Sequence, residues 1–521
     1  MIKKIFKPIT IGGASAIISI ASFFSYGMGL IRDKIIAYHF ATSQATDAYN
    51  ASFLIPDSIF NIFIASALTA AFMPVFAQSL ATDKAEARSL ANTVLTAANM
   101  LIILISAICF IFMEQITNLA YPDMSADMKE QIVTMTRIIL PSAIVFTISN
   151  TLGNILMSYK HFIAYSFSPI FYNGGIILGI TLFSDEIGIY SAAAGVIVGA
   201  IFHCAIRVVD IMFTEYKYKP ELNFQLKGFK KIIKLMIPKA LGLACWPINL
   251  YLISTVSVAL VEGGFAAFNY ARNIQSFAVS LFGIAFATAV FPSLTESIGS
   301  KRYDDFTEHI RKTLQRILFF TIPAMAGVMI LSTEITELIL GGGEFGSQSV
   351  ALTSIILLYF GLSIPFESTM HILTRGFYAV QNTITPTITN FVAMIVTGLI
   401  TVFVAAEYGV QWLSIAFSAG LIAQNILLLL LLKKHFQDFK FREFLSSMTK
   451  IIIATIFMIG LIIVTKDLES IINPKLSHLF RILIGGGGFI LAAIILKSPE
   501  VSSIKYIIDR LFKKHLHEKA K

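Results

Sequence analysis

Charged residues are scarce in this chain. Of its 521 residues only 14% are Asp, Glu, Lys or Arg, whereas 56% are hydrophobic, and the mean hydropathy is +0.76. Soluble globular domains carry about 25% charged residues, so the composition excludes that class. The long apolar runs also lack the strict alternation of a membrane β-barrel. We therefore predict an all-α polytopic membrane protein.

Cysteine is rarer still. The three cysteines, Cys109, Cys204 and Cys245, each lie inside an apolar run and show neither metal-ligand spacing nor a disulfide pattern. No cluster of His, Asp and Ser suited to catalysis converges at one leaflet. We therefore expect no metal site, no cofactor and no catalytic residue.

The apolar residues group into membrane spans, each of which needs about 20 mostly apolar residues. Two of the runs are long and interrupted by polar residues, which leaves the count open by one. We predict fourteen spans, at 9–31, 48–78, 90–113, 131–157, 162–183, 188–210, 235–260, 265–294, 314–339, 349–373, 384–406, 410–432, 449–465 and 478–496.

The basic residues are unevenly distributed along the chain. Most of the 40 Lys and Arg residues lie after the sixth, eighth and twelfth spans and in the tail. The positive-inside rule then places both termini in the cytoplasm. The basic excess is thus a topology signal that also favours anionic lipid head groups, and we predict no nucleic-acid partner.

Two pairs of similar segments indicate an internal repeat. Pro169 and Pro386 end similar segments 217 residues apart, and Pro74 and Pro292 lie in a second pair 218 residues apart. One shared offset predicts two parallel six-helix bundles related by pseudo-twofold symmetry, as in transporters, although short Pro-containing connections also recur by chance. The predicted parts are an N-lobe (1–213), a cytoplasmic amphipathic linker (214–234), a C-lobe (235–434), two further helices (435–498) and a basic cytoplasmic tail (499–521).

Ionisable residues inside spans require a reason, because each costs about 2.5–3.5 kcal/mol at the bilayer centre. Arg272 lies about ten residues into its span, and we predict that it lines a substrate cavity. Ser25, Gly29 and Arg32 share one helical face, which indicates a second part of that cavity. Alternatively, Arg32 anchors its helix at the outer membrane surface.

Further polar residues suggest gating or coupling. Asp57, near the start of the second span, either pairs with an arginine of the cavity or serves the helix start. Glu367, His371 and Arg375 are spaced i, i+4 and i+8, which predicts either a proton or gate pathway or a structural ion-pair ladder. From Arg375 to Pro386 we expect a short cytoplasmic turn set by its Gly and Pro.

The first hairpin resembles the MurJ/MviN family of lipid II flippases in the MOP superfamily. The segments 376–386 and 319–345 also resemble that family, and the resemblance runs from about residue 10 to 435. The matching residues of the hairpin are Ser25, Gly29, Arg32, Asp33, Ala37, Phe40, Asp47, Ala48, Pro56, Phe63, Phe72 and Pro74.

This resemblance implies a transporter of the bacterial cytoplasmic membrane. Its substrate would be a lipid-linked sugar diphosphate, the peptidoglycan precursor lipid II, flipped from the inner to the outer leaflet by alternating access. It adds Asp47 to the expected cavity residues Ser25, Gly29, Arg32 and Arg272. Membrane lipids and other cell-wall synthesis proteins are the implied partners.

The chain also departs from the family. Tyr26 stands where the family usually has Arg, and the seventh and eleventh spans lack the carboxylates with which some members hold sodium. The substrate and the coupling to a membrane potential or an ion gradient therefore stay open. The alternatives are another lipid-linked oligosaccharide, a small cation, a membrane enzyme and an assembly partner without transport.

Overall fold

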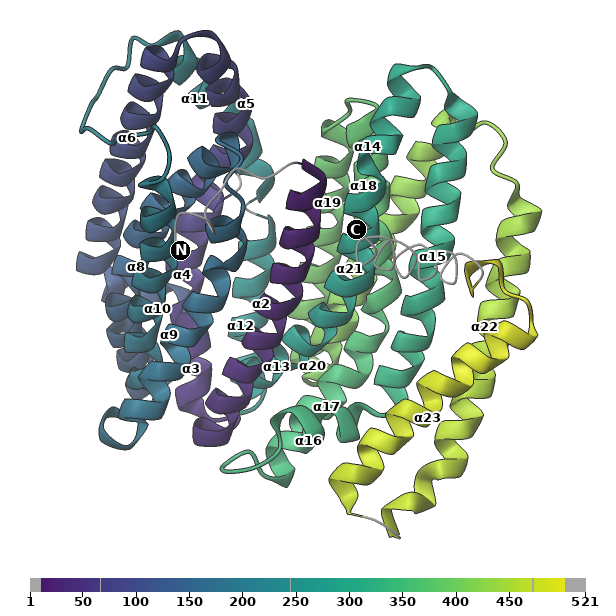
Figure 1. Ribbon diagram of the computed structural model, residues 1–521. Helices are drawn as coiled ribbons and strands as arrows, with labels where there is room; N and C mark the ends of the chain where they lie inside the picture. Colours follow the sequence, from purple (N-terminus) through teal and green to yellow (C-terminus); the bar gives the residue numbers. More distant parts are fainter. Residues whose placement is uncertain (1–10, 66, 244, 471–472, 502–521) are drawn as a thin grey trace, which may run out of the picture. The chain divides into compact units, whose positions relative to one another are not determined.

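The computed structural model describes residues 11–65, 67–243, 245–470 and 473–501 and is built from helices (Figure 1). Over these residues, ten helices are long and apolar enough to cross a membrane, and a pair bent by 45° would make an eleventh. The first ten residues and most of the predicted basic tail lie outside the described ranges. The predicted all-α polytopic fold is confirmed.

All fourteen predicted spans are helical where they are described. Nine are single helices: α2 (Ile11–Phe40), α6 (Lys84–Ile111), α8 (Ala126–Ser158), α9 (Ile163–Ile187), α10 (Tyr190–Ile211), α15 (Tyr303–Ile330), α21 (Gln411–Leu432), α22 (Phe441–Val464) and α23 (Pro474–Ile495).

The other five spans are interrupted. They comprise α3 (Gln44–Ser52), α4 (Leu54–Phe60), η1 (Asn61–Ala65) and α5 (Ala67–Thr82); α11 (Lys227–Leu243) and α12 (Cys245–Leu260); α13 (Gly264–Ala278), η2 (Val279–Ile284) and α14 (Ala285–Gly299); α17 (Ser347–Gly361) and α18 (Ser363–Ala379); and α19 (Ile384–Ile400), η3 (Thr401–Ala405) and α20 (Ala406–Tyr408). The short helices α7 (Met113–Ala120) and α16 (Ser332–Leu340) lie between spans.

Contacts divide the chain into two compact units. Unit 1 comprises Met1–Tyr270, Leu340–Ser349 and Thr401–Val410, and unit 2 comprises Ala271–Ile339, Val350–Ile400 and Gln411–Lys521. The division differs from the predicted lobe boundaries, since α12 and most of α13 belong to unit 1. The lobes, which were inferred from the sequence repeat, stay a prediction.

The repeat is visible in the local structure of each unit. The π-helical segments η1 and η2 begin 218 residues apart, at Asn61 and Val279. That offset is also the one between Pro74 and Pro292, which lie inside the following helices α5 and α14. π-Helical turns within α-helices are rare and occur often at functional sites.

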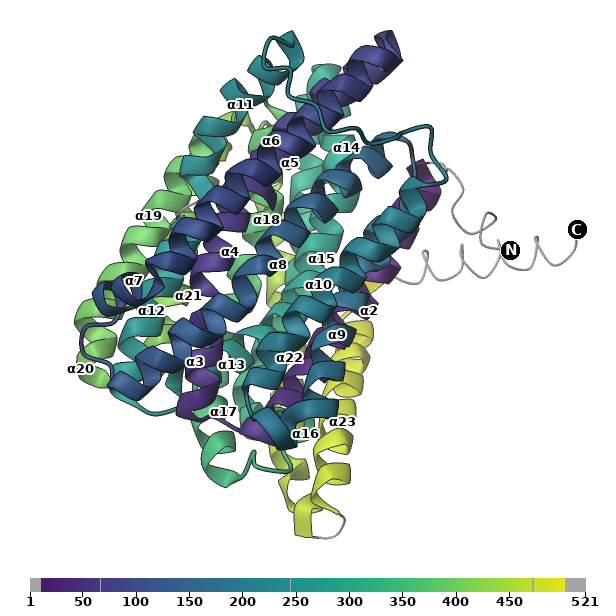
Figure 2. The same ribbon diagram turned by 90° about the vertical axis from the view of Figure 1, so that its left-hand side faces the viewer.

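The tightest packing in unit 1 joins α9 to α10, with α2 on the other side of α9 (Figure 2). Small residues form the seam, since a Cβ added to Gly175 would lie 2.3 Å from the Cα of Gly199. Such close backbone approach is how helices associate in membranes, where no hydrophobic effect drives them together.

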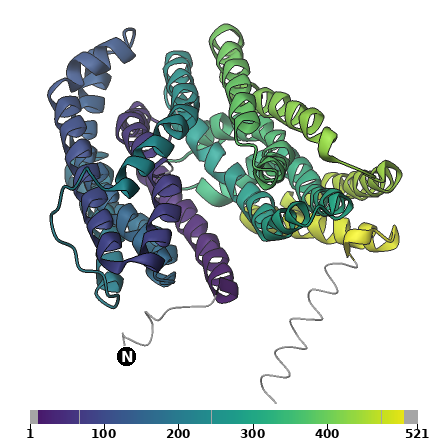
Figure 3. The ribbon, with the colours of Figure 1, turned by 90° about the horizontal axis from the view of Figure 1, so that it is seen from above.

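Unit 2 has its core between α14, α15, α18 and α21, with fully buried Phe306, Phe377 and Leu432. Helices α22 and α23 pair with each other and pack on α15 (Figure 1). Phe319, Ile451 and Phe489 are the buried contacts of that arrangement. In Figure 3 this yellow segment lies along the outer edge of its unit.

The predicted turn from Arg375 to Pro386 is shorter than expected. Arg375 and Gly376 lie inside α18, and the chain reverses between Val380 and Thr383. Gln381, not a glycine, adopts the left-handed conformation there, with φ +59°. Gly376 instead serves packing, since a Cβ at this position would lie 3.0 Å from Leu432.

Candidate functional site

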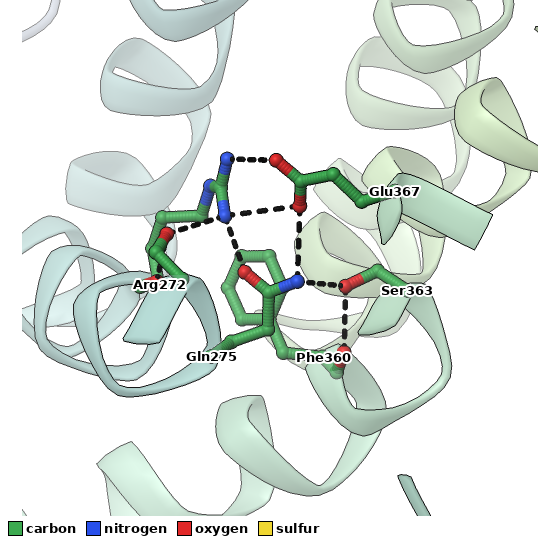
Figure 4. A network of polar contacts seen from close by, with 6 residues as sticks. Arg272, Gln275, Phe360, Ser363 and Glu367 are labelled. Carbon is green, nitrogen blue, oxygen red and sulfur yellow. Dashed lines mark hydrogen bonds and ion pairs between the residues drawn. The ribbon is translucent and has the colours of Figure 1, made fainter. Parts of the chain in front are cut away.

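Arg272 is the centre of a polar network in unit 2 (Figure 4). Its guanidinium Nη2 donates to Oε1 of Glu367 at 2.8 Å and its Nη1 to Oε2 at 3.2 Å, which is a bidentate ion pair. Gln275 also accepts from Arg272, and Gln275 Nε2 donates to Glu367 at 3.0 Å and to Ser363 at 2.9 Å. The side chains of Arg272 and Glu367 are 19% and 12% exposed.

Helical spacing brings these groups together. Arg272 and Gln275 are three residues apart on α13, and Ser363 and Glu367 are four residues apart on α18, so each pair lies on one face of its helix. The aromatic ring of Phe417, on α21, lies under the guanidinium with its centroid 4.7 Å from Cζ. The plane of the guanidinium is therefore fixed by partners from three helices.

The network determines what Arg272 can do chemically. A planar, permanently charged guanidinium binds phosphate oxygens in bidentate fashion, but here a carboxylate occupies that geometry. An anionic ligand must displace Glu367 or share the arginine with it. The arrangement is thus a preorganised cation whose charge is balanced until a ligand arrives.

The predicted stripe of Glu367, His371 and Arg375 lies on α18 as expected, but its members bond to different partners. Glu367 binds Arg272, whereas Arg375 Nη2 donates to the hydroxyl of Thr288 on α14 at 2.8 Å. His371 is half-buried and makes no hydrogen bond with the described residues. The three side chains therefore do not form an ion-pair ladder with one another, and their gating role stays a prediction.

In unit 1, Arg32 is held by two neighbours. Its guanidinium donates to Asp33 at 2.7 Å and to the amide oxygen of Asn173, on α9, at 3.1 Å, and its side chain is 23% exposed. Ser25 and Gly29 are half-exposed on the same helix, and a Cβ at Gly29 would meet no atom within 4 Å. This face of α2 therefore has open space beside it.

Asp57 and Asp47 have different environments. Asp57 is exposed at the start of α4 and makes no ion pair with the described residues, so the expected pairing with Arg32 is not formed. Asp47 is 1% exposed, and its two carboxylate oxygens accept from the backbone N–H groups of Gly263 and Ala266 at 2.8 and 2.7 Å. It thus caps the N-terminus of α13, which is a structural use of its charge.

Burial raises the pKa of Asp47 to about 7, although the backbone hydrogen bonds lower it. The ordinary value is 3.8, so the folded protein keeps a proton that the unfolded chain loses between about pH 4 and pH 7. The contribution of this group to the free energy of unfolding is therefore greatest at low pH and falls as the pH rises to about 7.

We expect Asp47→Asn to remove that part of the pH dependence. Melting temperatures in detergent, measured from pH 5 to 8, should show a smaller decline with rising pH in the variant than in the wild type. Asp123→Asn, at an exposed residue, is the control and should keep the wild-type slope. Parallel curves for Asp47→Asn and the wild type would contradict the raised pKa.

The sequence did not single out Gln275, Ser363 or Asn173 as site residues. The i, i+3 spacing of Arg272 and Gln275 and the i, i+4 spacing of Ser363 and Glu367 were available signals. No group of three or more His, Cys, Asp or Glu side chains suited to a metal occurs within the described ranges.

Known proteins resemble this chain along most of its length. Residues 36–484 match the family described as "Lipid II flippase MurJ". A "Probable lipid II flippase MurJ" of Thermotoga maritima is 25% identical over 487 residues, which cover 93% of this chain and 97% of the relative. A "Lipid II flippase MurJ" of Thermosipho africanus is 27% identical over 472 residues, with coverages of 91% and 94%.

Solved structures agree with the sequence matches. The structure described as "Lipid II flippase MurJ, inward closed conformation" has a TM-score of 0.80 and 25% identity, and the alignment covers 92% of this chain and 98% of that one. A multidrug resistance MATE family transporter of the MOP superfamily has a TM-score of 0.68 at 14% identity, with coverages of 80% and 95%. The second likeness shows the shared fold alone.

Proposed function

Because this chain belongs to the lipid II flippase MurJ family, we propose that it moves lipid II from the inner to the outer leaflet of the bacterial cytoplasmic membrane. The head group of such a lipid-linked sugar carries a diphosphate, whose charges do not cross hydrocarbon unaided. A flippase offers cations to that group in a solvated passage and then reverses its opening, which is alternating access.

The observation that carries the proposal is the geometry of Arg272 within a chain of this family. Its guanidinium is bidentate to Glu367, stacked on Phe417 and still 19% exposed. Phosphate oxygens fit the same two N–H groups that the carboxylate now occupies. Arg32, held by Asp33 and Asn173, is the second proposed contact for the diphosphate.

The orientation and the energy source belong to the same proposal. The basic loops support cytoplasmic termini. A negatively charged head group that crosses the membrane couples its movement to the membrane potential, at about 2.3 kcal/mol per charge and 100 mV. We propose the membrane potential or an ion gradient as the driving force.

Complementation tests the proposed function. The chain, expressed in a bacterium depleted of its own lipid II flippase, should restore growth. Arg32→Ala should lower that rescue at least tenfold, because the cavity loses a cation. Arg137→Ala, which removes an arginine paired with Glu114 near the membrane surface, should leave rescue intact.

Two outcomes would contradict the proposal. Wild-type protein that is present in the membrane at normal levels without restoring growth would transfer the proposal to a different lipid-linked substrate. Equal rescue by wild type and Arg32→Ala would remove Arg32 from the proposed substrate contacts.

A further inference from the structure

A cavity of about 540 Å³ lies in unit 2 where α15, α22 and the segment after α23 meet. Its volume is in the range of small-molecule sites. Two serines, Ser446 and Ser447, and two carboxylates, Glu443 and Glu500, contribute to the wall. Basic side chains dominate the rest of the lining, namely Arg311, Lys312, Arg316, Arg442 and Lys450.

The two carboxylates of the cavity are already engaged. Glu500 is 4% exposed and accepts from the hydroxyls of Ser447 and Ser498, both at 2.5 Å. Glu443 pairs with Arg311 at 3.1 Å. Neither carboxylate therefore neutralises the remaining cations of the wall.

The cations differ in what they bind. Arg311 and Lys312 also pair with Glu308, and the ammonium of Lys450 donates to the carbonyl of Lys497 at 3.0 Å. Arg316 is half-buried and Arg442 is exposed, and within the described part of the chain neither makes a hydrogen bond or an ion pair. These two guanidinium groups therefore keep all of their donors for a ligand.

The cavity lies at the level where the membrane begins. On α15 the basic segment ends at Arg316 and the apolar run begins at Ile317, and on α22 the change falls between Lys450 and Ile451. Large apolar side chains are exposed within the next two turns of α22 and near the end of α23: Ile452, Ile453, Ile456, Ile494 and Ile495. A head group in the cavity would thus have its acyl chains beside an apolar surface.

From this arrangement we propose that the cavity binds the phosphate head group of an anionic phospholipid of the inner leaflet, with Arg316 and Arg442 as its principal donors. Basic pockets at the cytoplasmic ends of membrane helices suit such head groups. The assignment to the inner leaflet follows from the proposed orientation. The site is separate from the proposed contacts of the transported lipid at Arg32 and Arg272.

The test measures lipid binding by the purified full chain in detergent. Short-chain phosphatidylglycerol, phosphatidylcholine with the same acyl chains, and inorganic phosphate are titrated separately while the melting temperature is recorded. Phosphatidylglycerol should stabilise the wild type, and the double substitution R316A/R442A should weaken its apparent affinity at least fivefold. The control K433A/K434A removes the same charge from exposed residues of unit 2 and should bind as the wild type does.

Each other result overturns the proposal. Equal loss of affinity in both double variants would mean that overall charge attracts the lipid, and unchanged affinity in R316A/R442A would mean that it binds elsewhere. Inorganic phosphate that stabilises as well as the lipid, with the same dependence on the two arginines, would replace the lipid by free phosphate. None of these readouts requires transport, so failure of the flippase proposal would leave the test valid.

Discussion

Replacing Arg272 with alanine is expected to abolish rescue of a bacterium depleted of its lipid II flippase. The substitution removes the proposed phosphate contact and also leaves Glu367, which is 9% exposed, without its cation. Breaking one side of a buried ion pair costs about 3–5 kcal/mol, so the amount of folded protein should fall as well. Growth and the quantity of monodisperse protein in the membrane are the two measurements.

A second substitution separates the two effects. In R272A/E367Q neither charge remains, while the glutamine amide still has Gln275 and Ser363 within reach. We expect this double variant to recover the wild-type amount of folded protein and to remain unable to rescue growth. Rescue by the double variant would show that Arg272 serves structure alone.

Gly175→Ala is expected to have the largest effect on stability. The added Cβ would lie 2.3 Å from both the Cα and the N of Gly199. Since packed carbon atoms lie about 3.5–4.0 Å apart, α9 and α10 would have to separate by more than about 1 Å. Overpacking of this kind costs about 1–3 kcal/mol, and a clash with backbone belongs at the upper end. The melting temperature and the yield of monodisperse protein in detergent measure the loss.

The neighbouring glycine is the matched control. A Cβ at Gly174 would meet no atom within 4 Å, and alanine favours the helix by about 1 kcal/mol over glycine. Gly174→Ala should therefore melt at or above the wild-type temperature. Equal losses at both positions would show that α9 tolerates no side chain there, and that the close approach to α10 is not the cause.

Much of the fold followed from local patterns. Apolar runs of sufficient length located all fourteen spans, because burial in lipid constrains composition along each span. The interruptions were harder to predict. The break between α17 and α18 lies at Leu362, in sequence that contains neither proline nor a charge for several residues, so composition carries no signal for it.

The candidate site was predicted only in part. The cost of a charge in a span identified Arg272, but its partner Glu367 is 95 residues away, and only the packing of α13 near α18 brings them together. The sequence grouped Glu367 with His371 and Arg375 because it shows spacing along one helix and not contacts between helices. Asp47 matched the family pattern, and its burial against the start of α13 was invisible in the chain order.

The π-helical segments η1 and η2 have a consequence for how side chains are directed along their spans. A π turn holds one residue more than an α turn, so everything beyond it is rotated by about 100° relative to an uninterrupted helix. A stripe drawn through Asp57 on α4 therefore does not continue along α5, and a stripe through Gln275 does not continue along α14. Each of these spans is two rods with separate angular phases, and its two ends address different neighbours.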